Sequence, residues 1–87
     1  MMNYEYPNTY KKKIFLVENS PERVVDFLKK FGEDLQVKVV NSSEEALELL
    51  KTSYSPDAVI ISKYMGGLKF LEQVRSNAWT KTLPVLS

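Results

Sequence analysis

Two short apolar runs constrain the fold of this chain more than any other feature. Residues 14–17 and 58–61 each consist of four consecutive apolar residues bounded by polar ones. A strand that is exposed on one face alternates apolar and polar residues, whereas a strand covered on both faces is apolar throughout. We therefore expect both runs to be central strands of a parallel sheet with helices on both of its faces.

Segments with a helical spacing of apolar residues connect the predicted strands. The first follows Ser20, a favourable N-cap residue, and begins at Pro21, which suits the first helical position. The second follows Ser42, which together with Glu45 has the spacing of a capping box. The third begins at Gly67, after a second glycine. The sequence thus predicts strands over residues 14–17, 35–40, 58–61 and 83–86, and helices over 21–31, 43–51 and 67–75.

This alternation of strands and helices predicts an α/β fold, a doubly wound parallel sheet with right-handed crossovers. The strand over residues 35–40 alternates apolar and polar side chains, which indicates a less covered strand at an edge of the sheet. We expect the apolar side of the third helix to carry Leu68, Phe70, Leu71 and Val74.

Composition limits the classes of function that the chain can have. Its 87 residues suffice for one small domain, and we expect residues 1–12 to form an N-terminal arm and residues 13–87 the domain itself. A net charge of +1 gives no strong attraction to nucleic acid or to an anionic membrane. The sequence has no cysteine, no histidine and no apolar run near the roughly 20 residues that span a bilayer. We therefore expect a cytoplasmic protein.

Several segments, in the right order, resemble the receiver domain of two-component response regulators. They are residues 14–21, 43–50, 56–61, 67–75 and 83–85, and the resemblance extends over residues 13–87. It implies a flavodoxin-like topology with four strands and three helices. The last strand and the last two helices of the family have no counterpart before Ser87. The fourth strand is then left with an unpaired edge, which makes a monomer marginal, so we expect either a fragment of a longer receiver or an edge that a second copy covers.

The resemblance also implies where a site would lie, and there the sequence departs from the family. The family has an acidic pair after the first strand and a phosphoacceptor aspartate after the third. Here these positions fall on Glu18, Asn19 and Ser62, followed by Lys63. Aspartyl phosphorylation needs a carboxylate nucleophile and a divalent cation. We therefore expect no catalytic residue, no cofactor, and lost or weak Mg²⁺ binding, with Glu18 alone as a weak candidate ligand.

Lys63 and Trp79 leave alternatives open, and Asp57 is excluded as a substitute acceptor. Lys63 either pairs with Glu18, placing an ammonium group where the metal would be, or points to solvent. Asp57 starts the third predicted strand, so it lies about 16 Å from the strand's end and cannot replace the acceptor. Trp79 either anchors a partner or packs over the end of a helix.

The sequence therefore predicts a degenerate receiver-like domain that is not an enzyme and acts as a phosphorylation-independent protein-interaction module. Its partner would be a signalling protein or a second copy, bound through the edge of the fourth strand. The alternative is a functional phosphorelay receiver with an acceptor that the sequence does not reveal. A small nucleotide-binding enzyme is disfavoured, because no glycine-rich turn follows the first strand.

Overall fold

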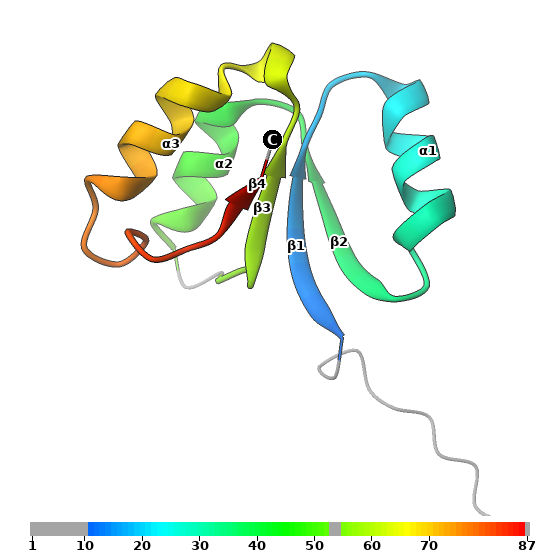
Figure 1. Ribbon diagram of the computed structural model, residues 1–87, viewed down its shortest axis with the longest axis horizontal. Helices are drawn as coiled ribbons and strands as arrows, with labels where there is room; N and C mark the ends of the chain where they lie inside the picture. The colour runs from blue at the N-terminus through cyan, green and yellow to red at the C-terminus, as the bar shows by residue number, and fades with distance from the viewer. Residues whose placement is uncertain (1–10, 53–54, 87) are drawn as a thin grey trace, which may run out of the picture.

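The two apolar runs lie side by side in the middle of a four-stranded parallel sheet. The computed structural model describes residues 11–52 and 55–86, and within them the strand order is β2-β1-β3-β4 (Figure 1). Helix α1 lies on one face of the sheet, and helices α2 and α3 lie on the other. The elements are β1 (Lys12–Val17), α1 (Pro21–Phe31), β2 (Leu35–Val40), α2 (Ser43–Leu50), β3 (Ala58–Ile61), the 3-10 helix η2 (Lys63–Met65), α3 (Gly67–Arg75) and β4 (Val85–Leu86).

This architecture confirms the predicted doubly wound sheet. The differences from the predicted elements are small: β1 starts two residues earlier, and β4 is limited to its last two predicted residues. Most of the predicted N-terminal arm, residues 1–12, lies outside the described residues, and Lys12 belongs to β1.

Strand β1 is central, as its apolar run predicts. In the register of the sheet, Ile14 lies between Val37 of β2 and Ala58 of β3. Residues 14–17 are all at most 7% exposed, because both faces of this strand are covered. Strand β2 lies at the edge of the sheet, which agrees with its alternating sequence.

The main core lies between the sheet and helices α2 and α3. Helix α3 contributes Phe70 and Val74, which are spaced by four residues and share one side of the helix. Leu68 is 76% exposed, so its expected place on the buried side is wrong. Leu68 lies two residues before Phe70, about 200° around the helix, and so falls on the exposed side of α3. The core residues are Phe15, Val17, Val40, Ala46, Val59, Ile61, Phe70 and Val74.

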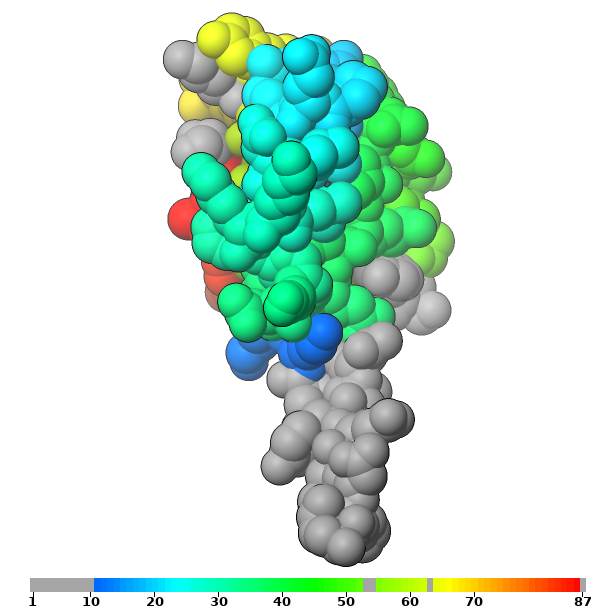
Figure 2. All heavy atoms as spheres, turned by 90° about the vertical axis from the view of Figure 1, so that its right-hand side faces the viewer, coloured from blue at the N-terminus to red at the C-terminus, as the bar shows by residue number. Residues whose placement is uncertain are grey.

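The opposite face of the sheet is covered less completely. None of the residues of α1, all of which the structure describes, is buried. Val25, Leu28 and Phe31 are 39–48% exposed. Ile60 of β3 pairs with Leu86 of β4, which is 57% exposed. Figure 2 views the molecule from the side of α1, and part of β4 emerges in red at the margin of the helix. Apolar surface therefore remains accessible beside α1.

Side-chain caps fix the starts of α1 and α2, as the sequence predicts. The Oγ atom of Ser20 accepts a hydrogen bond from the Arg23 backbone N–H at 3.4 Å. The Oγ atom of Ser42 accepts one from the Glu45 N–H at 3.1 Å. The Glu45 carboxylate in turn accepts from the N–H of Asn41, one residue before the cap. Both caps begin helices that follow directly on the carboxyl ends of strands.

Candidate functional site

The carboxyl ends of β1 and β3 bring the predicted site positions to one edge of the sheet. The Ser62 N–H donates to the Val17 carbonyl oxygen at 3.2 Å, so Ser62 follows β3 at the level where β1 ends. The Glu18 N–H donates to the Val40 carbonyl oxygen at 3.0 Å, which fixes Glu18 beside the end of β2. Glu18, Asn19 and Ser62 therefore lie where functional sites form in open parallel sheets.

The carboxylate of Glu18 is buried and fully engaged by donors. Glu18 is 5% exposed, and it is the buried charged residue among those described. Its Oε2 atom accepts hydrogen bonds from the backbone N–H groups of Asn19 and Ser20, both at 3.1 Å. Its Oε1 atom accepts one from Nε of Arg23 at 2.9 Å. Glu18 thus caps the turn into α1 and forms an ion pair with the first turn of that helix.

These contacts set the pKa of Glu18. Burial raises the pKa of this carboxyl. The hydrogen bond and charge of Arg23, together with the two backbone donors, lower the pKa by more than burial raises it. The net result is a pKa below the ordinary value, because every donor favours the ionised form. The hydrogen bond to Glu18 likewise raises the pKa of Arg23. Glu18 is therefore a weak base and remains charged at neutral pH.

Arg23 connects the end of β1 with the segment that follows β3. Its side chain is 50% exposed, and its Cζ atom lies 5.2 Å from the centre of the Tyr64 ring, over the ring. Tyr64 belongs to η2, directly after Ser62. The guanidinium thus contacts a carboxylate at one strand end and an aromatic ring beyond the neighbouring strand end.

Arg23 is not among the predicted site residues, although the sequence carries a signal for it. Arg23 lies five residues after Glu18 and three residues after the N-cap Ser20. A helix that starts beside a strand end directs its first-turn side chains back over that end. The ion partner considered from sequence was Lys63, whose side chain lies outside the described residues.

The remaining predicted positions have local structural roles. The Oγ atom of Ser62 accepts a hydrogen bond from the Tyr64 N–H at 3.4 Å and so caps η2. Asn19 is exposed, and its backbone N–H donates to Glu18. Trp79 is 85% exposed, so packing over the end of a helix does not bury it.

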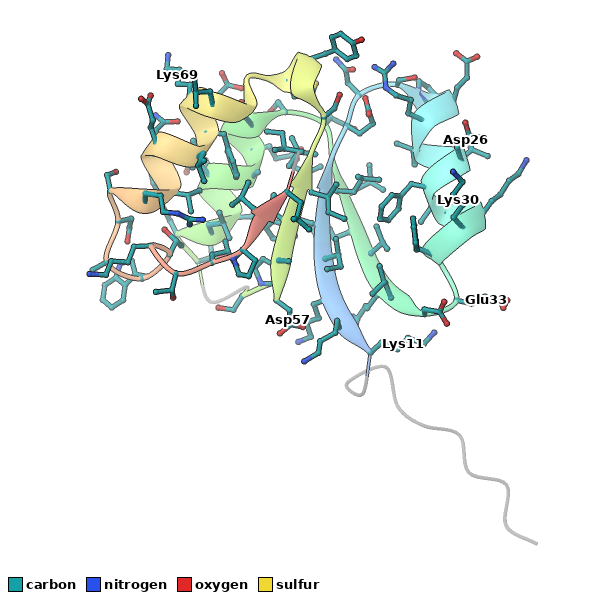
Figure 3. The ribbon with its side chains drawn as sticks, in the orientation of Figure 1. Lys11, Asp26, Lys30, Glu33, Asp57 and Lys69 are labelled. Atoms are coloured by element: carbon teal, nitrogen blue, oxygen red, sulfur yellow. The ribbon has the colours of Figure 1, made fainter. Side chains whose placement is uncertain are left out.

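Asp57 lies at the other end of the sheet, as expected. Its Oδ2 atom accepts a hydrogen bond from the Lys13 N–H at 2.7 Å. Figure 3 shows Asp57 at the amino end of β3, at the same end of the sheet as Lys11, which precedes β1. Asp57 therefore cannot take part in chemistry beside Glu18.

The one buried carboxylate described at this edge already has protein donors. Magnesium takes several hard oxygen ligands in octahedral geometry, usually with one or two carboxylates. Here the carboxylate oxygens of Glu18 already accept from a guanidinium and two N–H groups. No cluster of three or more acidic, histidine or cysteine residues that could hold a metal occurs in the described part of the chain.

Two solved structures share this fold. One is the signal receiver domain of a signal transduction histidine kinase from Syntrophus aciditrophicus, with a TM-score of 0.70 and 22% sequence identity over 85% of this chain. The other is the N-terminal domain of a response regulator receiver protein from Methanoculleus marisnigri JR1, with a TM-score of 0.71 and 28% identity over 85% of this chain. The chain has the fold of a receiver domain.

The receiver-like chain spans 58% of the length of the first of these structures and 63% of the second. Its sequence matches no protein-family model and no curated protein. In the described residues of this receiver-like chain, every helix is too short or too polar to cross a membrane.

Proposed function

We propose that this receiver-like chain acts in two-component signalling as a protein-interaction module that works without accepting a phosphoryl group and without enzymatic activity. The observation that carries the proposal is the ion pair between Glu18 and Arg23. It places a positive charge against the carboxylate that would otherwise be a candidate ligand for the divalent cation that aspartyl phosphorylation needs.

The nucleophile at the acceptor position also argues against phosphoryl transfer. Ser62 offers a hydroxyl group, which is a weak nucleophile unless a base removes its proton. The sequence has no histidine. The nearby carboxylate, Glu18, is held ionised by Arg23 and has a lowered pKa, so it is poorly suited to serve as that base. Asn19 is neutral and adds no negative charge that would attract a cation.

Phosphorylation by a small-molecule donor tests this proposal directly. The full chain is incubated with Mg²⁺ and acetyl phosphate, and its intact mass is followed. A receiver domain with an aspartate acceptor, treated identically, is the positive control. We expect the control to gain one phosphoryl group and this chain to gain none. A phosphorylated chain contradicts the proposal and favours the phosphorelay alternative, and peptide mapping then identifies the acceptor.

We propose a second copy of the chain as the partner of the β4 edge. Among the described residues, no strand pairs with the outer edge of β4. An exposed backbone edge is a template for another strand, and a two-fold axis lets two identical edges pair. The residues of β4, Val85 and Leu86, are uncharged and create no repulsion between copies. Leu86 adds exposed apolar surface that such pairing covers.

Light scattering coupled to size exclusion measures the oligomeric state. Leu86→Glu places a charge on the proposed contact and is expected to shift the chain toward the monomer. Leu68→Glu is the matched control, since Leu68 is also exposed but lies on α3. A wild-type chain that is monomeric at high micromolar concentration contradicts the dimer. The alternative is then that a different protein binds to the edge of β4.

A further inference from the structure

Arg23 has two partners that belong to different parts of the fold. It sits in the first turn of α1 and donates from Nε to the buried carboxylate of Glu18 at 2.9 Å. Burying a carboxylate is unfavourable unless an opposite charge and hydrogen bonds compensate for the lost hydration. The two backbone donors to Glu18 are neutral, so among the described side chains Arg23 supplies the full positive charge that pairs with Glu18.

The second partner of Arg23 is the Tyr64 ring, with a distance of 5.2 Å from Cζ to the ring centre. The backbone of Tyr64 is itself tied to the end of β3, because its N–H donates to Ser62 Oγ. A guanidinium is planar, so it donates at its edge to a carboxylate while its face lies over an aromatic ring. The arginine therefore couples the turn after β1 to the segment after β3.

We propose that Arg23 is a resident cation of this site, which neutralises Glu18 and holds η2 in place through Tyr64. The conformation of the segment after β3 is then set by the protein's own charge, independently of any divalent cation or phosphoryl group. This proposal deepens the phosphorylation-independent function proposed above and concerns the same site.

The first test asks whether Arg23 excludes divalent cations. The full-length variants are Arg23→Met and Asn19→Asp/Arg23→Met, and millimolar Mg²⁺ is titrated while the amide NMR signals of residues 18–20 and 62–65 are followed. We expect no saturable shifts in the wild type, weak saturation in the single variant and saturation at lower Mg²⁺ in the double variant. Lys30→Met is the matched control, because Lys30 is an exposed lysine of the same helix (Figure 3). It is expected to behave as the wild type does.

The second test separates charge neutralisation from a purely structural role. If Arg23 chiefly compensates the buried charge, then removing both charges in Glu18→Gln/Arg23→Met gives a higher unfolding midpoint than Arg23→Met alone. The comparison of unfolding midpoints remains informative if Arg23→Met folds poorly. Arg23→Lys restores the charge without the planar group, so it is expected to suppress Mg²⁺ binding while the signals of residues 62–65 broaden.

Three outcomes overturn the proposal. The first is a folded Asn19→Asp/Arg23→Met variant with no response to Mg²⁺. The second is a wild type that responds as strongly as that variant. The third is a double variant, Glu18→Gln/Arg23→Met, that is no more stable than Arg23→Met. None of these outcomes depends on phosphorylation, so failure of the resident-cation role is distinguishable from failure of the proposed function.

Discussion

Nε of Arg23 lies 2.9 Å from Oε1 of Glu18, in an ion pair whose acidic side chain is 6% exposed and whose basic side chain is 50% exposed. This difference in exposure determines how each of the two residues contributes to the stability of the fold. The exposed guanidinium stays hydrated without its partner, whereas the carboxylate depends on its donors to remain ionised. Stability should therefore depend more on the donors to Glu18 than on how well Arg23 itself is buried.

Replacing Glu18 by glutamine is predicted to lower the free energy of unfolding by about 1–3 kcal/mol, the usual cost of losing hydrogen bonds to a buried charged group. The side chain keeps its shape but loses its charge and its ion pair with Arg23. Urea denaturation followed by circular dichroism measures the change. Glu48→Gln is the matched control, because Glu48 pairs with Lys51 while 75% exposed. It should change the stability by less than about 0.5 kcal/mol, and equal losses in both variants would contradict the role of burial.

The lowered pKa of Glu18 predicts a loss of stability in acid. A carboxyl with a depressed folded-state pKa contributes stability that is fully present above its unfolded-state pKa, near 4.5. This contribution is lost as the pH falls through the folded-state pKa, because protonation breaks the ion pair with Arg23. Unfolding free energies of wild type and Glu18→Gln are compared from pH 7 down to pH 3. The difference between them should shrink below about pH 4.5, and a constant difference would contradict this assignment.

The fold was predictable because local signals agreed with one another. The apolar runs at residues 14–17 and 58–61 identified the two central strands, and Ser20 and Ser42 marked the starts of two helices correctly. The predicted position of Leu68 was wrong, because the spacing of apolar residues in a short helix does not show whether a first-turn residue lies on the buried or the exposed side. Only the packing of Phe70 and Val74 decides which side faces the sheet.

The site was predictable only in part. The strand ends placed Glu18 and Ser62 on neighbouring strands, since carboxyl ends of parallel strands share one edge. Arg23 was not predictable as a site residue, because an arginine in an exposed first helical turn usually points to solvent. Its roles depend on the angle between α1 and the sheet and on the position of Tyr64, and both are tertiary features. The absence of phosphoryl acceptance and the loss or weakness of metal binding at this edge remain predictions.

The contrast within α3 gives a prediction about the core. Phe70 is 1% exposed and Leu68 is 76% exposed, although they lie two residues apart on the same helix. Phe70→Ala leaves a cavity under α3 and is predicted to cost about 3–5 kcal/mol, which approaches the total stability of a small domain. Leu68→Ala should cost less than about 0.5 kcal/mol. Thermal unfolding by circular dichroism compares the two, and similar losses would show that α3 packs on a different side.

The join between η2 and α3 depends on the backbone of Gly66. Its φ is 73°, in the left-handed region, and a Cβ atom added there meets nothing within 4 Å. The cost of Gly66→Ala is therefore conformational, and we predict about 1–2 kcal/mol from the strain of an L-residue in this region.

Gly67→Ala is the matched control for Gly66→Ala, because it changes the adjacent glycine. Gly67 lacks a positive φ, and its added Cβ would lie 3.5 Å from Cγ2 of Ile61, an ordinary van der Waals contact. Alanine also favours helix over glycine by up to about 1 kcal/mol, so Gly67→Ala should be neutral or stabilising. Urea denaturation of both variants gives the comparison. If Gly66→Ala and Gly67→Ala destabilise the chain equally, the left-handed backbone conformation of Gly66 is not the reason why a glycine is needed there.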